Sequence, residues 1–236
     1  MKEMFNNKRI LIVAAHPDDE LLGLGGTICR LKRKHKSHIG VLLLGEGITS
    51  RSNSRDTKKW EKEIIVHQKN ILEAKKFLGY DDLFLHGFPD NRFDSVPLLD
   101  IIKVVEDTVL NFKPDIIFTH HEGDLNIDHQ VTYKAVITST RPFNNPSLNS
   151  IFTFETPSST EWQFGLKQGS FKPNFFVEIK KEDLDNKIKA MECYKYEKRD
   201  FPHPRSSNSL TTLAKLRGIQ NGKEFAEAFV LVRSNI

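Results

Sequence analysis

Apolar residues in this chain form short unbroken runs, separated by longer stretches with helical spacing. The runs at residues 9–15 (RILIVAA) and 38–44 (HIGVLLL) show no polar alternation, which is typical of strands buried on both faces of a parallel sheet. Shorter runs predict two further strands at 83–86 and 115–119. The first half of the chain therefore contains four predicted strands, each followed by a longer segment.

In those longer segments apolar residues recur every three to four positions, as on a helix with one buried face. Gly79 supplies a stop for the second helix, Pro97 suits the first turn of the third, and a fourth is predicted over 128–138. The buried stripes of the first three are Leu21, Leu24, Ile28 and Leu31; Trp60, Ile64, Ile71 and Leu78; and Leu98, Ile101, Val105 and Val109. This alternation predicts an α/β fold with a Rossmann-like, doubly wound, mostly parallel sheet and helices on both faces.

The last third of the chain is less regular and predicts a C-terminal α/β elaboration of the same domain. No linker or repeat interrupts the sequence, so residues 1–236 are expected to form one domain. The predicted elements are strands at 151–154 and 175–179, a helix over 183–194, a Pro/Ser-rich segment at 201–209, a helix over 210–220 and a strand at 228–232.

Composition sets only broad limits on function. The net charge of +4 is small, and the one basic run, at residues 32–36, falls at a predicted helix end, so no nucleic-acid partner is expected. Cys29 and Cys193 show neither disulfide nor metal-site spacing. The N-terminus is polar and no window has the length of a membrane span, so we expect a cytoplasmic protein. The sequence does not determine whether the protein forms a homo-oligomer.

Two clusters of imidazole and carboxylate residues follow strands of the predicted sheet. HPDDE, at residues 16–20, follows the first strand, and HHEGDLNIDH, at residues 120–129, follows the fourth. Open parallel sheets bind their ligands at the carboxyl ends of the strands. We therefore expect both clusters to lie on the same rim of the sheet.

The spacing within these clusters predicts a catalytic metal site. His16 and Asp19 are three residues apart across a strand-to-helix turn, so both can face one ion, and His129 would complete the set. Two imidazoles and one carboxylate leave a position open for water and suit zinc, with ferrous iron as the alternative. Asp18, beside a ligand but pointing elsewhere, would be placed to accept a proton from that water.

Each of these residues also has a simpler interpretation when it is taken alone. Asp18 or Asp19 could cap the following helix, and a single histidine at a strand end is more often structural than a ligand. Helix capping does not account for HPDDE at one strand end together with Asp128 and His129 at another. The combination favours the metal site.

The AHPDDE segment followed by a later Asp-His resembles the LmbE-like, or PIG-L, family of zinc-dependent N-deacetylases. The resemblance extends over nearly the whole chain and implies removal of an acetyl group from a small-molecule N-acetylated sugar or sugar conjugate. The other similar segments are PDNRFD at 89–94, GDLNIDH at 123–129, HPRS at 203–206, and RG with AEAF at 217–218 and 226–229.

The resemblance also implies roles for individual residues. His16, Asp19 and His129 would hold the metal, Asp18 would act as general base, and Asp128 would orient a ligand or the base. Substrate contacts are expected from Arg51, Asn91, Arg92 and Asp94. For the last three, surface charges that order loops are an equally open interpretation.

One position departs from the family pattern. Many members carry a histidine three residues before the final ligand, where it supports the oxyanion or the leaving group, and this chain has Asn126 there. Asn126 can donate a hydrogen bond but cannot carry a proton at neutral pH. The second polar group of the reaction is therefore unassigned by the sequence.

Several other functions compete with amide hydrolysis. A dinucleotide site is disfavoured because GLGG, at 23–26, lies inside the first predicted helix and not at the strand-to-helix turn. A phosphorylated receiver domain would not need the two histidine motifs, and the acidic turn with Pro17 is a poor cradle for phosphate. A non-catalytic metal- or carbohydrate-binding relative is the remaining alternative, against which the intact Asp18 argues.

Overall fold

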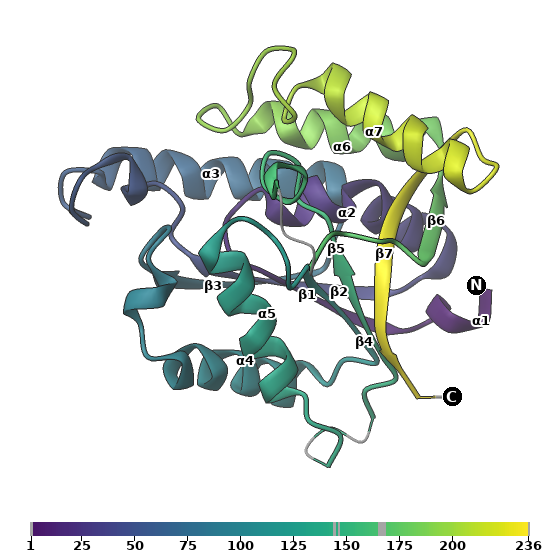
Figure 1. Ribbon diagram of the computed structural model, residues 1–236, viewed down its shortest axis with the longest axis horizontal. Helices are drawn as coiled ribbons and strands as arrows, with labels where there is room; N and C mark the ends of the chain where they lie inside the picture. The colour runs from purple at the N-terminus through teal and green to yellow at the C-terminus, as the bar shows by residue number, and fades with distance from the viewer. Residues whose placement is uncertain (1, 144, 146, 165–168, 236) are drawn as a thin grey trace.

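One seven-stranded sheet runs through the computed structural model, which describes residues 2–143, 145, 147–164 and 169–235 (Figure 1). The strand order is β3-β2-β1-β4-β5-β7-β6. Strands β1 to β5 are parallel, and β7 is antiparallel to both of its neighbours. The strands are β1 (Arg9–Ala14), β2 (His38–Gly45), β3 (Asp82–Phe88), β4 (Ile116–His120), β5 (Ser150–Phe154), β6 (Phe175–Ile179) and β7 (Phe225–Ser234).

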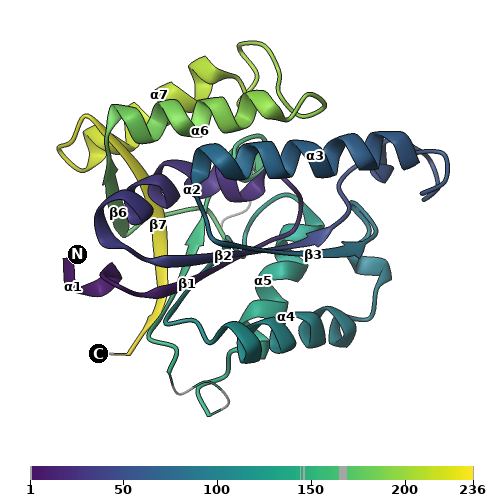
Figure 2. The ribbon, with the colours of Figure 1, turned by 180° about the vertical axis from the view of Figure 1, so that it is seen from behind.

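Helices cover both faces of the sheet, which confirms the predicted doubly wound α/β architecture (Figure 1, Figure 2). Helices α2, α3, α6 and α7 lie over one face, and α4 and α5 lie over the other. The helices are α1 (Lys2–Phe5), α2 (Asp19–Arg30), α3 (Glu61–Leu78), α4 (Leu98–Phe112), α5 (Ile127–Ser139), α6 (Lys181–Cys193) and α7 (Ser207–Gln220). No helix among these residues is both long and apolar enough to cross a membrane.

Strand β1 supplies side chains to two separate hydrophobic cores. Ile10 and Ile12 pack into the core beneath α2 and α3, whereas Leu11 and Val13 pack into the core above α4 and α5. Successive residues of a strand point to opposite faces, so a central strand covered on both sides must be apolar at every position. This requirement explains the unbroken apolar run at the start of the chain.

The C-terminal third belongs to the same sheet. Strand β7 lies between β5 and β6 and is longer at both ends than the predicted strand at 228–232. The predicted helices over 183–194 and 210–220 begin earlier, at Lys181 and Ser207. Because β7 pairs with β5, the predicted elaboration extends the parallel part of the sheet at the β5 edge.

A buried ion pair joins this third of the chain to α2. Glu227 on β7 accepts hydrogen bonds from the backbone N–H groups of Gly26 (3.1 Å) and Thr27 (2.6 Å), and Lys187 on α6 donates to it at 2.6 Å. Helix α2 departs from helical geometry at Leu24 (φ −148°). Glu227 therefore satisfies backbone donors just beyond that irregular turn.

The glycines of the GLGG segment serve helix packing. A Cβ at Gly23 would lie 2.3 Å from the ring of Phe154, and one at Gly26 would lie 2.6 Å from Ile179. Glycine lets α2 approach the sheet this closely. The segment lies along a buried helix, as its position in the sequence indicated, and not at the turn after β1.

Candidate functional site

The predicted ligand clusters meet because their strands are neighbours. Strands β1 and β4 pair in parallel, so the loops that leave their carboxyl ends begin side by side. The turn after β1 carries Asp18 at φ 103°, a left-handed conformation that costs a non-glycine residue about 1–3 kcal/mol. Strain of this kind is found where the surrounding structure fixes a side chain for function.

His16, Asp19 and His129 form a compact set of candidate metal ligands. Asp19 Oδ2 lies 3.3 Å from His16 Nδ1 and 3.3 Å from His129 Nε2, and one ligand atom from each residue lies within 4.8 Å of the others. His129 Nε2 is buried and has no hydrogen-bond partner among the described residues. Such an orphaned nitrogen beside a carboxylate fits a divalent cation, and two imidazoles with one carboxylate are a donor set that zinc accepts.

In His16 and His129, the ring nitrogen that does not face Asp19 lies beside another carboxylate. Asp128 Oδ2 lies 2.9 Å from His16 Nε2, and its Oδ1 accepts a hydrogen bond from the backbone N–H of Phe93 at 2.9 Å. Asp124 Oδ1 lies 3.0 Å from His129 Nδ1. Carboxylates in these positions fix the ring orientation of metal-binding histidines. The structure thus places Asp128 where an orienting role is expected, and adds Asp124.

Charge at the cluster is balanced between the imidazoles and the acids. Burial opposes a charged His129, but Asp19 and Asp124 outweigh it and raise the pKa of His129 to about 9. Burial likewise opposes a charged Asp124, yet His129 and the hydroxyl groups of Ser159 and Thr160 lower its pKa to about 2. A cation in this site would therefore displace protons from the imidazoles.

Asp18 is buried beside the ligand set but lies outside it. Arg205 Nη1 donates to Asp18 Oδ2 at 3.0 Å. Burial raises the pKa of Asp18 well above its ordinary value, while the Arg205 guanidinium opposes that rise. A buried carboxylate with a raised pKa is suited to accept a proton near neutral pH.

A polar cavity of about 300 Å³, the site cavity, opens onto these groups. It is lined by residues from six parts of the chain: the turn after β1, the loops around residues 47–51 and 90–91, the start of α5, the segment 158–162 and the segment after α6. The lining residues are His16, Pro17, Asp18, Gly47, Ser50, Arg51, Asp90, Asn91, Asn126, His129, Ser158, Ser159, Trp162, Glu197, Arg199, His203 and Arg205.

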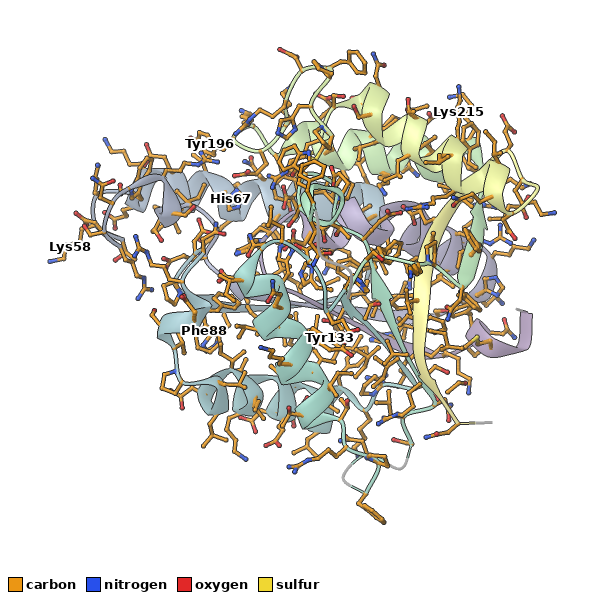
Figure 3. All side chains as sticks on the ribbon, viewed as in Figure 1. Lys58, His67, Phe88, Tyr133, Tyr196 and Lys215 are labelled. Carbon is orange, nitrogen blue, oxygen red and sulfur yellow. The ribbon has the colours of Figure 1, made fainter. Side chains whose placement is uncertain are left out.

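The expected substrate-binding residues fall into two groups. Arg51 and Asn91 line the site cavity, and the Arg51 guanidinium donates to the backbone carbonyl of Tyr196 at 3.0 Å, a residue labelled in Figure 3. Arg92 and Asp94 are not among the cavity-lining residues. Arg92 instead donates to the backbone carbonyl of residue 53 at 3.1 Å, so it orders the neighbouring loop.

Asn126 acts as the N-cap of α5. Its Oδ1 accepts a hydrogen bond from the backbone N–H of Asp128 at 2.8 Å, and its Nδ2 donates to Asn91 Oδ1 at 2.8 Å. The amide oxygen and one of the two amide N–H groups are therefore engaged within the protein, although the residue lines the cavity.

Sequence reasoning gave no role to several residues of the site. Asp90 reaches His16 Nε2 at 3.5 Å, and His120 accepts a hydrogen bond from the backbone N–H of Ala15 at 2.9 Å. Arg205 belongs to the HPRS segment, whose similarity to bacterial family members was the only sequence signal for it. Asp124 lies in the same histidine-rich cluster as His129, but nothing in its spacing marks its function.

The model of the family described as PIG-L, GlcNAc-PI de-N-acetylase, matches residues 11–140, more than half of the chain. The chain belongs to the PIG-L family. The matched residues include the three candidate metal ligands and Asp18, whereas Arg205 lies outside them. Within this family the chain is similar to YaiS of Escherichia coli K12, an uncharacterized deacetylase, with 30% identity over 80% of this chain and 92% of that protein.

Solved structures show the same fold at lower identity. The N,N'-diacetylchitobiose deacetylase from Pyrococcus horikoshii has a TM-score of 0.74 and 20% identity, covering 95% of this chain and 84% of its own. GalB from Pseudomonas putida KT2440, a 4-carboxy-2-hydroxymuconate hydratase, has a TM-score of 0.72 and 19% identity, covering 97% and 98%. Because this fold supports both reactions, the fold of a PIG-L family member does not identify its reaction by itself.

Proposed function

We propose that the chain is a metal-dependent N-deacetylase that releases acetate from an N-acetylated amino sugar or sugar conjugate. One observation carries the proposal: the His16, Asp19 and His129 ligand set opens onto a cavity that also contains the buried carboxylate of Asp18. Family membership and the similarity to the P. horikoshii N,N'-diacetylchitobiose deacetylase support the choice of an N-acetyl sugar.

His16 Nδ1, Asp19 Oδ2 and His129 Nε2 would hold a zinc ion, with ferrous iron as the alternative. The ion would supply Lewis acidity, lowering the pKa of water and polarising a carbonyl oxygen. Asp128 and Asp124 keep the two imidazoles in the orientation that this binding needs.

Asp18 carries the proton in this mechanism. As the oxygen of water bonds to the acyl carbon, Asp18 accepts the proton that the water loses. The C–N bond then breaks, and the proton passes from Asp18 to the amine nitrogen. The products are acetic acid and the amine, which exchange a proton and leave as acetate and the protonated amine, and Asp18 returns to its starting ionisation state.

The charges around the reacting centre favour an amide over a phosphate ester. The turn after β1 and the start of α2 contain Asp18, Asp19 and Glu20, all buried, and Pro17 supplies no backbone N–H. A neutral acetamide is tolerated there, whereas the acids repel a phosphate group. Phosphate sites are usually built from glycine-rich loops or clustered basic residues.

Acetate release from a panel of N-acetyl sugars tests the proposal. We expect turnover that chelator abolishes and that zinc or ferrous ion restores. Asp18→Asn should keep its metal and lose about 10²–10⁴-fold in kcat, because it removes the proton acceptor. Activity that survives complete metal removal, or phosphatase turnover without deacetylation, would contradict the proposal, and metal binding without turnover would favour the non-catalytic relative.

A further inference from the structure

Amide hydrolysis develops negative charge on the acyl oxygen, and a second donor besides a metal usually stabilises it. Asn126 is held by Asp128 and Asn91, which leaves one N–H of its amide unbonded, and a neutral amide stabilises an oxyanion less than a charged donor does. The inference below rests on the proposed function and concerns which residue supplies the donor in its place.

Arg205 is the cavity-lining guanidinium that contacts Asp18. Its Nη1 donates to Asp18 Oδ2 at 3.0 Å and to Glu197 Oε2 at 2.7 Å, and its Nε donates to Ser158 Oγ at 2.7 Å. No hydrogen bond joins its Nη2 to an acceptor among the described residues. Nε and Nη1 are thus held by protein groups, with Nη1 beside the base, and Nη2 remains available to a ligand.

The other two guanidinium groups of the site cavity are held differently. Arg51 bonds to the backbone of Tyr196 and pairs with Glu197, and Arg199 donates to two backbone carbonyls, of Tyr196 at 2.7 Å and Lys198 at 2.9 Å. Neither forms a hydrogen bond with Asp18 in the described structure. Proximity to the reacting centre therefore singles out Arg205.

We propose that Arg205 is a catalytic residue whose Nη2 donates a hydrogen bond to the oxyanion formed when water adds to the acyl carbon. In this step the water oxygen bonds to the carbon, the carbonyl electron pair moves onto the acyl oxygen, and the proton of water goes to Asp18. Arg205 stays protonated throughout. When the C–N bond breaks, the electron pair returns to form the carbonyl of acetate.

The backbone around Arg205 is already fixed for this function. Its N–H donates to His203 Nδ1 at 3.2 Å, and the next residue, Ser206, is the N-cap of α7 and accepts from the backbone N–H of Ser209 at 3.1 Å. Donors that are held before the reaction need no reorganisation when charge develops. The anchors on Glu197 and Ser158 hold the side chain in the same way.

A tetrahedral anion tests the assignment without turnover. Zinc-loaded wild-type, Arg205→Lys and Arg205→Gln proteins would be titrated by calorimetry with methylphosphonate, which mimics the tetrahedral state and whose negative charge the bound zinc offsets against the acids of the site, and with acetate, which is planar. Arg205→Lys keeps the charge near Asp18 but loses the fork that can bond Asp18 and a ligand together. We expect its methylphosphonate affinity to fall at least about tenfold while its acetate affinity changes by less than about threefold.

Kinetics supply the second readout. Arg205→Lys should lower kcat by about 10²–10³-fold, the usual effect of losing one oxyanion donor, with a KM near that of wild type. Added guanidinium ion should restore part of the kcat of Arg205→Gln but none of that of Asp18→Asn. Arg33→Lys, which changes a guanidinium paired with Asp183 on α6 and does not line the site cavity, is the matched control and should behave as wild type.

Three results would overturn the assignment: unchanged methylphosphonate binding in Arg205→Lys, loss of zinc from that variant, or a wild-type protein that does not bind methylphosphonate. The second result would mean that Arg205 only maintains the architecture of the metal site. A wild-type protein that binds methylphosphonate through Arg205 but releases acetate from no N-acetyl sugar would overturn the proposed function and leave the oxyanion site in place.

Discussion

The imidazole of His120 stacks on that of His129, with ring centroids 3.8 Å apart and an angle of 13° between the planes. His120 Nε2 accepts from the backbone N–H of Ala15, and its Nδ1 lies 3.2 Å from the Thr156 hydroxyl. Burial and the neighbouring His129 lower the pKa of His120 to about 4, so the ring is neutral at pH 7. His120 therefore acts as a fixed neutral surface against a candidate metal ligand.

Removing that surface should weaken metal binding. His120→Ala frees the His129 ring to rotate and leaves the Ala15 N–H without its acceptor, and we expect about a 10–100-fold loss of zinc affinity. His120→Phe keeps a flat ring against His129 and should lose less. Competition titrations with a chromophoric chelator measure both variants, and equal losses would show that stacking has no part in orienting His129.

Asp124 is expected to matter for the metal more than for the fold. Asp124→Asn preserves the shape of the side chain but removes the charge beside His129 Nδ1, so zinc affinity should fall about 10–100-fold. Asp115→Asn, remote from the site and paired with Lys8, is the control. Zinc binding at wild-type strength in Asp124→Asn would remove the orienting role assigned here.

Arg51 and Arg92, both expected from the sequence to contact substrate, should differ in their effects on the kinetics. Arg51→Ala should raise KM more than it lowers kcat, because Arg51 lines the site cavity but is not part of the candidate ligand set. Arg92→Ala should act only through the loop that it orders and leave KM closer to wild type. Steady-state kinetics on the N-acetyl sugar identified by the acetate screen compare them directly, and an equal rise in KM for both would return Arg92 to the binding residues.

His67, labelled on α3 in Figure 3, predicts a loss of stability in acid. Burial lowers its pKa to about 4, against an ordinary value of 6.5, and neither ring nitrogen has a hydrogen-bond partner among the described residues. Because the unfolded chain binds this proton more readily, the stability associated with neutral His67 is lost as pH falls from 6.5 towards 4. At pH 5 the loss relative to pH 7 is about 2 kcal/mol.

His67→Phe checks this prediction, because it fills the site with a ring that does not titrate. Urea unfolding at pH 7 and pH 5 should show a smaller pH dependence in the variant than in wild type. Identical pH dependence in the two proteins would mean that other groups account for acid sensitivity.

The buried pair of Lys187 and Glu227 should dominate the stability of the C-terminal third. Glu227→Gln leaves the Lys187 charge buried without its partner, and breaking such a pair costs about 3–5 kcal/mol. Asp185→Asn removes the partner of Lys181 on the exposed side of the same helix and should change little. Thermal unfolding of the two variants gives the comparison, and equal melting temperatures would contradict this assignment.

The sequence predicts those parts of the fold that depend on the local spacing of apolar residues and on local turn signals. Strand β1 was predictable because burial on both faces requires an unbroken apolar run, and the stop at Gly79 because its φ of 79° favours glycine. The insertion of β7 between β5 and β6 could not be predicted, because the sequence of a strand does not identify the strands that pair with it. Tertiary packing alone determines that pairing.

The candidate ligands were predictable for a similar reason. His16, Asp19 and His129 follow strands whose carboxyl ends must share one rim, so their convergence follows from the strand-end rule. Arg205 reaches Asp18 across 187 positions of sequence from an irregular segment. No local pattern encodes that contact, and the pairing of Glu227 with α2 is equally remote.

The place of β7 has a consequence for the protein as it is being made. A ribosome releases β1, α2 and the ligand-bearing loops long before it releases Arg205 and β7. Until then the N–H groups of Gly26 and Thr27 lack Glu227, and Asp18 lacks Arg205. The nascent chain can therefore gather its candidate metal ligands before the residues that anchor Asp18 and α2 have been made.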